Sequence, residues 1–406
     1  MTEVTLIGLG EVGTEAARML AASAGTTGLT VAGRRPGRLT ERLERAGVRA
    51  TVRYADLTDP GSLRALAEET QVLVNCAGPA EEVGNRLVRA AVDGGADLVD
   101  VGGDDVLHRQ LDQDQLARAG RVVVVSAGLR PGLTGLLPRA VANRLAGCAP
   151  AKPANPDGPA NPAGPVTRDD PATSGAPPGP PRLPRPLRLR AVVGVLDRFT
   201  LTAARDYLDA SELVRPLATW RDGAVSPRTA RRGQEELPFL GPVPLLPGLD
   251  PEAERLAVRL GLEHGDWATA LRGEHVARAF DLTRGADPAT AAEALSRASQ
   301  LDLTGRTPST VLLFEVTGPD GTRCLVLRGE RQARLSAATL TATVLALGGG
   351  PEDRAPHTCP PGAHFAAEVL DPEWTLRQVR TAAPEVAPLW HDGPLTDLLP
   401  TEEGLL

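Results

Sequence analysis

The sequence predicts an α/β protein with an N-terminal doubly wound parallel sheet and a second, α+β domain. Over residues 1–125, short and fully apolar runs alternate with amphipathic helical patterns, as in parallel sheets that helices cover on both faces. The first apolar run leads directly into a glycine-rich turn. After residue 187 the expected strands are fewer, the helices are longer and one strand–turn–strand signal is present, which favours α+β.

Strands and helices alternate regularly in the first part of the chain. Strands are expected at 4–7, 29–32, 50–54, 72–74, 98–101 and 122–125. Asp59 and Pro60 have the residue types that cap and open a helix, and a helix over 106–119 is expected to stop at Gly120. This alternation indicates one parallel sheet in a first domain of residues 1–148.

The composition changes abruptly between 149 and 186. Prolines recur there at nearly every third position, with Gly, Ala and Asn and with very few large apolar side chains. Such a segment buries too little apolar surface to offset its ordering entropy. The sequence therefore predicts a disordered, extended insert, and an inert surface insertion is favoured over a proline-motif docking segment.

Order is expected to resume at 187, in a second domain that extends to residue 350. Strands are expected at 189–196, 215–220, 311–316 and 324–327, helices at 251–262, 288–301 and 336–347, and a Pro/Leu-rich loop at 237–249. The C-terminal segment, 351–406, contains a helix that Asp371 and Pro372 open.

Composition and charge restrict the class of partner. The 406-residue chain has a net charge of −7 and contains no uncharged apolar stretch near the length of about eighteen residues that a membrane span requires. The acidic balance argues against nucleic acid as a partner. The first strand begins so close to Met1 that we expect a cytoplasmic protein without a targeting segment.

The four cysteines are far apart in the sequence and are expected to be reduced thiols. His357, Cys359 and His364 lack a clear fourth ligand, so no metal site is predicted. Only one of the 44 basic residues is a lysine, Lys152, and it falls in the predicted insert. We therefore expect no catalytic lysine from a folded region.

The turn after the first strand has the pattern G-x-G-x-x-G, with Gly8, Gly10 and Gly13. In a strand–turn–helix context the first glycine allows the tight bend, the second admits a pyrophosphate and the third allows helix and strand to pack closely. The phosphates bind free N–H groups at the helix N-terminus, where Glu11 and Val12 follow Gly10. A dinucleotide site is favoured over an ordinary strand–helix turn.

The residues after the second strand predict which dinucleotide is bound. In NAD-preferring sheets that strand commonly ends in an acidic residue, which binds the ribose hydroxyls. Here it is followed by Arg34 and Arg35, whose guanidinium groups can clamp a 2′-phosphate. We therefore expect NADP(H); the alternative is a solvated surface pair. Asp56, after the third strand, is placed to contact the adenine or, equally, to cap a helix.

Polar and glycine-rich clusters follow the fourth, fifth and sixth strands, at the edge where ligands of open α/β sheets bind. The expected cofactor contacts are Asn75, Cys76, Ala77, Gly78 and Pro79, then Gly102 and Gly103, and finally Gly128. Asp104 is a candidate catalytic residue, and a helix cap is an equally good interpretation of it.

Substrate contacts are expected from Arg130, Asp206 and Trp267, and further catalytic candidates are Tyr207 and His264. These side chains can line a cleft that faces the cofactor, although a surface or core role is favoured for each second-domain residue taken singly. His264 is the preferred proton donor because imidazole titrates near neutral pH. The Tyr–Lys pair of short-chain reductases is absent from the sequence.

Five segments, in this order, resemble the saccharopine dehydrogenase-like (saccharopine reductase-like) oxidoreductases. They are GLGEVG at 8–13, GRR at 33–35, VNCAGP at 74–79, GADLVDVGG at 95–103 and SAGLRPGL at 126–133. The resemblance covers the first third of the chain well and the rest loosely. It implies an NADP-binding Rossmann domain, an α/β second domain, a C-terminal segment that returns toward the first domain, and a homodimer.

The resemblance also implies a class of reaction. Relatives of this kind reduce imines formed between an amine and a carbonyl compound, or act as trans-acting enoyl reductases on carrier-tethered substrates. The Lys/His pair of the lysine-forming enzymes cannot come from a folded region here, so secondary metabolism is favoured. The sequence therefore predicts an NADPH-dependent reductase of a C=N bond, of imine-reductase or opine-forming type. Reduction of a C=C bond and a non-catalytic NADP(H)-binding protein are the alternatives.

Overall fold

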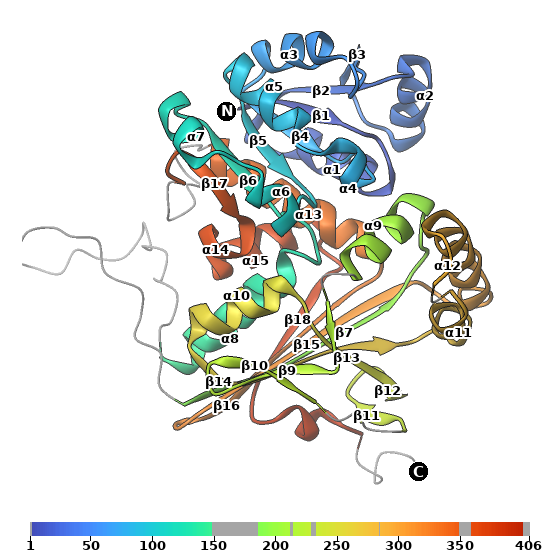
Figure 1. Cartoon of the computed structure of the whole chain (residues 1–406), viewed down its shortest axis with the longest axis vertical. Helices are drawn as coiled ribbons and strands as arrows, with labels where there is room; N and C mark the ends of the chain where they lie inside the picture. Colours follow the sequence, from blue (N-terminus) through green and yellow to red (C-terminus); the bar gives the residue numbers. More distant parts are fainter. Residues whose placement is uncertain are drawn as a thin grey trace, which may run out of the picture.

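The computed structural model contains two large sheets, each with its own helices (Figure 1). It describes residues 2–147, 186–211, 214–228, 233–283, 285–348 and 359–400. The insert predicted at 149–186 therefore lies outside the described residues, apart from its last position. In Figure 1 the first sheet lies at the top and the second at the bottom, with the long helix α13 (Gln332–Gly348) between them.

The first sheet is entirely parallel over the part of the chain that the structure describes, in the order β17-β6-β5-β4-β1-β2-β3. Its strands are β1 (Thr2–Ile7), β2 (Thr26–Gly33), β3 (Thr51–Tyr54), β4 (Val72–Asn75), β5 (Asp97–Asp100), β6 (Val122–Val125) and β17 (Gly362–Phe365). The central strands are buried on both faces, as at Leu6, Leu73 and Val123. The predicted doubly wound sheet is confirmed, and β17 brings part of the C-terminal segment to its edge.

Helices cover both faces of this sheet (Figure 1). They are α1 (Glu11–Ala22), α2 (Pro36–Ala46), α3 (Pro60–Glu68), α4 (Ala80–Val83), α5 (Arg86–Gly94), α6 (Asp105–Arg109) and α7 (Gln113–Ala119). Asp59 caps α3 by accepting a hydrogen bond from Gly61 N. The single helix expected over 106–119 is instead divided into α6 and α7, because the Asp112 side chain accepts from Gln115 N and starts a new helix.

The second sheet is mixed: among the described residues, β7 and β14 are parallel neighbours and the other pairs are antiparallel. Its main path is β10-β9-β14-β7-β15-β16-β18, and β13 pairs with β14 and β8. The strands are β7 (Leu187–Leu196), β8 (Arg215–Pro216), β9 (Ala218–Arg221), β10 (Ala224–Pro227), β13 (Leu245–Leu249), β14 (Leu262–Leu271), β15 (Ser309–Gly318), β16 (Gly321–Gly329) and β18 (Ala387–Asp392).

The second domain contains more strand than the sequence indicated. The stretch 237–249, expected as a loop, contributes to β11 (Glu235–Leu237), β12 (Gly241–Val243) and β13. Leu237 and Val243 are buried against the second sheet, and this packing stabilises short strands despite the prolines. The strand expected at 215–220 is divided into β8 and β9 because Leu217 has a positive φ of 52°.

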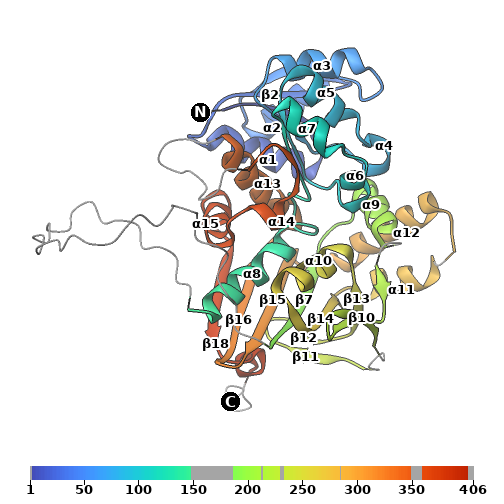
Figure 2. The same cartoon turned by 60° about the vertical axis from the view of Figure 1, so that its left-hand side comes forward.

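The helices of the second half lie in three groups (Figure 2). On one face of the second sheet are α8 (Leu133–Leu145) and α10 (Pro251–Leu260), beside it are α9 (Leu201–Ser211), α11 (Glu274–Leu282) and α12 (Pro288–Asp302), and toward the first domain are α13, α14 (Ala366–Val369) and α15 (Pro372–Ala382). The structure shows that α8, which the sequence division assigned to the first domain, packs against β15 and β16. None of the described helices is long and apolar enough to cross a membrane.

One apolar core continues from the first domain into the second. Leu20 of α1, Leu340 of α13 and Phe314 of β15 belong to the same buried cluster. Helix α13 packs along α1, and their N-termini lie at the same end, because Leu345 near the end of α13 approaches Gly25 beyond the end of α1. The shared core therefore brings the start of α13 to the edge of the first sheet where β1, β4, β5 and β6 end.

Candidate active site

The glycine turn between β1 and α1 leaves room only for glycine at two of its three positions. Gly8 has a φ of +92°, and a Cβ there would lie 2.5 Å from Ala77 N. A Cβ on Gly13 would lie 2.0 Å from Gly8 O, so the first turn of α1 contacts the end of β1 directly. A Cβ on Gly10 would meet nothing within 4 Å, which leaves the backbone there accessible to a ligand.

The N-terminus of α1 provides the donors that a pyrophosphate needs. Gly10 is the N-cap and contributes no side-chain hydrogen bond. The helical hydrogen bonds begin at Thr14 N, which donates to Gly10 O, so the N–H groups of Glu11, Val12 and Gly13 have no helical acceptor. Free N–H groups and open space at Gly10 fit the pyrophosphate of a dinucleotide.

The Gly13→Val variant should lose dinucleotide binding. The added side chain meets the Gly8 carbonyl, which no rotamer change can relieve, so helix and strand must separate at the phosphate site. We expect the Kd for NADPH, measured by its fluorescence, to rise by more than about tenfold. Gly10→Ala, whose Cβ meets no protein atom, controls for stability alone, because Gly10 itself adjoins the phosphate site. Normal NADPH binding by Gly13→Val would contradict this assignment.

Arg34 and Arg35 lie exposed in the loop between β2 and α2. Asp56, after β3, accepts hydrogen bonds on Oδ1 from Thr58 N at 2.9 Å and from Thr58 Oγ1 at 2.8 Å. These hydrogen bonds, with a smaller contribution from the Arg34 charge, lower the pKa of Asp56. Arg34 therefore lies near Asp56 at the end of the sheet where the adenosine of a dinucleotide binds.

A buried pair of side chains joins the ends of β4 and β5. Asn75 Nδ2 donates to Asp100 Oδ2 at 2.8 Å, and Asn75 Oδ1 accepts from Ala77 N at 2.9 Å. The other carboxylate oxygen of Asp100 accepts from Gly102 N at 2.9 Å. Asn75 and Asp100 are only 2% and 4% exposed, so this buried network fixes the loops that follow β4 and β5.

Three carboxylates gather where these loops meet α9 of the second domain. Asp206 of α9 accepts from Ala80 N at 2.8 Å, across the two domains. Burial raises the pKa of Asp100 to about 6, and the charges of Asp206 and Asp104 add to the increase. Burial also raises the pKa of Asp104 and that of Asp206. Asp104 also caps α6 by accepting from Val106 N, which confirms the cap interpretation, and its catalytic role stays a prediction.

Arg130 and Tyr207 lie on the same side of this edge. Arg130 donates from Nε and Nη2 to Asp250 Oδ2 at 3.2 and 3.0 Å, and from Nη1 to Thr269 Oγ1 at 3.0 Å. Burial raises the pKa of Tyr207, and the Arg130 charge acts in the opposite direction. The Tyr207 ring packs edge-on against Phe199 at 5.6 Å between centroids. The loop after β6 is therefore tied to α9, α10 and β14.

Asp104, Arg130, Asp206 and Tyr207 thus lie together at the carboxyl edge of the first sheet, and we call these four residues the candidate active site. The predicted cofactor residues after β4 and β5 border it: a Cβ on Gly78 would meet Thr202 and Asp206 of α9. Burial strongly raises the pKa of the Cys76 thiol, which is therefore a packing group. Pro79 is the N-cap of α4. Gly103 has a φ of +56°, and a Cβ there would crowd the Asp100 carboxylate.

Gly128 and Trp267 have packing roles in this structure. A Cβ on Gly128 would lie 2.7 Å from Val101 O, so this glycine permits two loops to touch. Trp267 is 9% exposed and belongs to the shared core. It lines, together with Arg130 and Glu252, a cavity of about 20 Å³, which is large enough for a water molecule but not for a substrate.

The structure does not bring His264 to the candidate active site. Thr269, the strand residue that contacts Arg130, lies five positions further along β14, about 17 Å away at the usual rise of a strand. His264 instead lies beside Asp222 and Glu263, the one close group of possible metal ligands among the described residues. We therefore set aside His264 as the proton donor.

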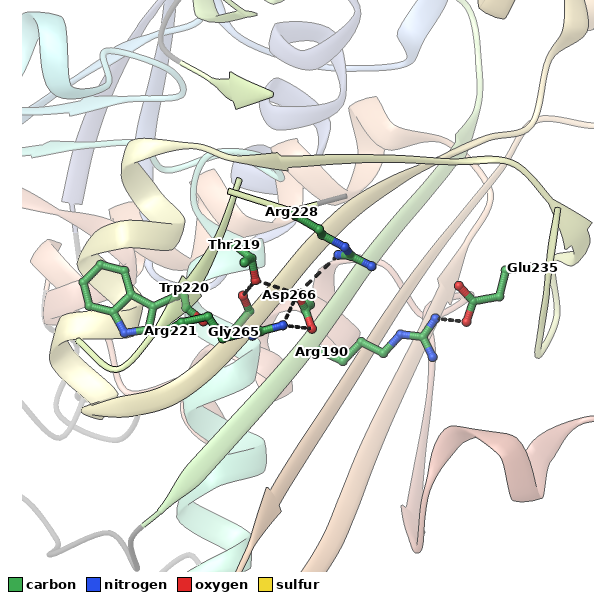
Figure 3. A network of polar contacts seen from close by, with 8 residues as sticks. All are labelled: Arg190, Thr219, Trp220, Arg221, Arg228, Glu235, Gly265 and Asp266. Atoms are coloured by element: carbon green, nitrogen blue, oxygen red, sulfur yellow. Dashed lines mark hydrogen bonds and ion pairs between the residues drawn. The ribbon is translucent and has the colours of Figure 1, made fainter. Parts of the chain in front are cut away.

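The neighbouring part of β14 belongs to a separate ion-pair network. Figure 3 shows Asp266 contacting Thr219, Arg221 and Arg228. The Asp266 carboxylate is 2.6 Å from Thr219 Oγ1 and 3.2 Å from Arg221 Nη2. These partners hold β9 and its hairpin with the edge strand β10 against β14, so the network stabilises the second sheet.

Several residues of the site gave no usable signal in the sequence. Asp250 is readable as a helix cap, and it does accept from Ala253 N, but its contact with Arg130 joins positions 120 residues apart. Glu252 is buried and accepts from Gly132 N and Thr134 Oγ1 at the start of α8. Such contacts depend on the packing of α10 against the first domain, which no local pattern encodes.

Comparison with known proteins agrees with the geometry of the first domain. Residues 4–125 match the family model described as the saccharopine dehydrogenase NADP binding domain. A probable mitochondrial saccharopine dehydrogenase-like oxidoreductase of Arabidopsis thaliana is 33% identical over 120 residues, and a lipid droplet localized protein of Caenorhabditis elegans is 36% identical over 80 residues. These alignments cover 27% and 19% of this chain and only 26% and 19% of the two relatives.

The fold of the whole chain is similar to that of a solved saccharopine dehydrogenase. The apo histidine-tagged saccharopine dehydrogenase (L-Glu forming) from Saccharomyces cerevisiae superposes with a TM-score of 0.62 at 14% identity, covering 96% of this chain and 100% of that one. At this identity the likeness shows the fold alone. Residues 4–125 therefore form an NADP(H)-binding domain of the saccharopine dehydrogenase type, and the chain as a whole is similar in fold to a saccharopine dehydrogenase.

Proposed function

We propose that the chain is an NADPH-dependent reductase that transfers hydride to the C=N bond of an imine formed from an amine and a carbonyl compound. The observation that carries this proposal is the gathering of Asp100, Asp104 and Asp206 at the edge where β4 and β5 end. The Asp104 charge raises the pKa of both Asp100 and Asp206, and carboxylates gathered in this way favour a cation beside them. A protonated imine is such a cation.

The side chains of the candidate active site have distinct roles in this proposal. NADP(H), when bound, supplies the hydride. Asp206 and Asp104 bind the cationic nitrogen, and no strong acid is needed because an iminium carbon is already electrophilic. The Arg130 side chain keeps 29% of its surface exposed despite its ion pair with Asp250, and it holds an anionic group of the substrate, such as a carboxylate. Tyr207 orients the substrate from α9.

The position of Tyr207 near Arg130 favours a second candidate function, reduction of an activated C=C bond. A hydroxyl and a guanidinium on one side of the site could stabilise an enolate and return a proton to it. A carrier-tethered enoyl substrate is consistent with that chemistry.

Isotope tracing separates the two candidates. With NADPH labelled by deuterium at the transferred position, an imine substrate acquires deuterium on a carbon bonded to nitrogen. An enoyl substrate acquires it on a carbon that has no nitrogen. We expect the first result from a panel of amine and keto-acid pairs, read by mass spectrometry. Label found only in enoyl products would replace the first proposal by the second. If no imine and no enoyl substrate caused NADPH to be consumed, both proposals would be contradicted.

Asp206→Asn should reduce imine turnover selectively. The amide oxygen can still accept from Ala80 N, so the contact between the domains is kept while the negative charge is lost. We expect kcat/KM for a cationic imine to fall about tenfold, and the Kd for NADPH to stay within about twofold. Asp93→Asn, an exposed position on α5, is the matched control. An Asp206→Asn enzyme with full activity on cationic imines would contradict the role of this carboxylate.

A further inference from the structure

Arg331, just before α13 in the second domain, forms an ion pair with the glycine turn of the first domain. Its Nη2 donates to Glu11 Oε2 at 3.0 Å. Glu11 is the first residue of α1 and provides one of the free N–H groups that fit a pyrophosphate. A guanidinium from the far half of the chain therefore reaches the phosphate site directly.

The Nε group of Arg331 lies near a buried carboxylate, while the side chain as a whole stays accessible. Nε lies 3.8 Å from Oδ1 of Asp197, whose side chain is 1% exposed, and the buried Nε has no hydrogen-bond partner among the described residues. Asp197 is itself held by the N–H groups of Arg198 and Gln332. The Arg331 side chain as a whole remains 42% exposed. Nη2 can thus exchange its partner while Nε stays near Asp197.

The negative charge of Glu11 beside the phosphate site gives a reason for Arg331 to exchange Glu11 for a phosphate. The Glu11 carboxylate stands next to the site for a pyrophosphate, and two like charges there repel each other unless a cation lies between them. The N-terminus of α13 faces the same edge, since Ser336 in its first turn accepts from Leu129 N at 3.3 Å in the loop after β6. The second domain therefore brings a guanidinium and a helix N-terminus, both favourable to anions, beside the N-terminus of α1.

We propose that Arg331 binds the pyrophosphate of NADP(H), giving up its ion pair with Glu11 for a charge-assisted contact with phosphate. The matched family domain ends at residue 125, so this contact adds a second-domain residue to the cofactor site. Cofactor binding is then a property of both domains. The proposal rests on the NADP(H) site and is independent of which bond is reduced.

Binding titrations with three ligands test the proposal without using activity. NADPH and NADH share the pyrophosphate, whereas adenosine 2′-monophosphate has the 2′-phosphate but no pyrophosphate. Arg331→Gln should raise the Kd for NADPH and for NADH by the same factor, about tenfold or more, and leave the affinity for adenosine 2′-monophosphate unchanged. Arg334→Gln is the matched control, because Arg334, three residues further on in α13, pairs with Glu385 instead.

The direction in which Glu11→Gln changes the Kd for the two dinucleotides separates a phosphate ligand from a structural ion pair. If Arg331 is a phosphate ligand, removing Glu11 frees it and removes a repulsive charge, so the Kd for both dinucleotides should fall by about threefold. If the ion pair is only a strut between the domains, both variants lose the same contact and affect binding alike. Unchanged dinucleotide affinity in Arg331→Gln, or a loss in Glu11→Gln equal to that in Arg331→Gln, would overturn the proposal. A wild-type protein that binds neither dinucleotide would overturn it together with the cofactor assignment.

Discussion

The Arg34→Ala, Arg35→Ala double variant is expected to bind NADPH about a hundredfold more weakly than the wild type, with little change for NADH. Both side chains are exposed after β2, where a 2′-phosphate on the adenosine ribose would lie. Each charge-assisted contact to a phosphate is worth about 1.5 kcal/mol or more, and two such contacts multiply to this factor. Fluorescence titration of the two nicotinamide dinucleotides measures the change.

The selectivity between the two dinucleotides is the informative quantity in that experiment. Arg45→Ala, at the far end of α2 in an ion pair with Glu41, removes one positive charge away from the predicted phosphate site and should change neither Kd. Equal losses for NADPH and NADH in the double variant would mean that Arg34 and Arg35 support the fold of the loop and do not bind the 2′-phosphate. The effect should also differ from that of Arg331→Gln, which we expect to be the same for both dinucleotides.

Glu252→Ala is expected to lower the free energy of unfolding by about 3 kcal/mol. Glu252 is 7% exposed, and its carboxylate accepts from Gly132 N at 2.5 Å and from Thr134 Oγ1 at 2.6 Å. The truncation leaves Gly132 N without its acceptor, leaves Thr134 Oγ1 only the Leu129 carbonyl, and enlarges the existing cavity of about 20 Å³ beside Trp267. It also releases the loop that carries Arg130. Thermal and denaturant unfolding measure the loss, and an unchanged midpoint would contradict it.

The contribution of Glu252 to stability should depend on pH. Burial, and next the charge of Asp250, raise the pKa of Glu252 to about 7, well above its value of about 4.5 in an unfolded chain. A group whose pKa is higher in the folded state stabilises most while it is protonated in both states. Its contribution is therefore complete below about pH 4.5 and is lost as the pH rises through about 7.

Glu252→Gln is the control for this pH dependence, because it keeps the volume of the side chain but cannot ionise. The stability of the wild type relative to Glu252→Gln should fall between pH 4.5 and pH 7.5 and then level off. Denaturant unfolding at a series of pH values measures this difference. A difference that is constant over the range would contradict a raised pKa of Glu252 in the folded protein, although the residue is only 7% exposed.

The first domain could be predicted well because its signals are local. The apolar runs at β1, β4 and β6 and the Asp59–Pro60 helix start each occupy a few consecutive residues. The second domain was predicted less well. Its short strands β11 to β13 depend on burial of Leu237 and Val243 against the second sheet, which the proline-rich local sequence conceals.

The candidate active site was predictable only in part, for the same reason. Asp104, Arg130 and the glycine-rich loops follow strands of a parallel sheet, so the rule that ligands bind at carboxyl ends predicts that they share one edge. Asp206 and Tyr207 lie on a helix of the other domain, and their approach to Ala80 and Arg130 required the structure. His264 has a suitable side chain for catalysis, but its position on β14 removes it from the site.

The sequence by itself determined the parallel sheet, the dinucleotide turn and the expected choice of NADP(H), because residues 8–35 carry those signals within one strand–helix–strand unit. Only the tertiary structure decided which residues of the second half lie beside the candidate active site and the glycine turn. The contacts of Arg130 with Asp250 and of Glu11 with Arg331 join positions 120 and 320 residues apart. They exist because α10 and α13 pack on a core that both domains share, and this packing is a property of the whole chain.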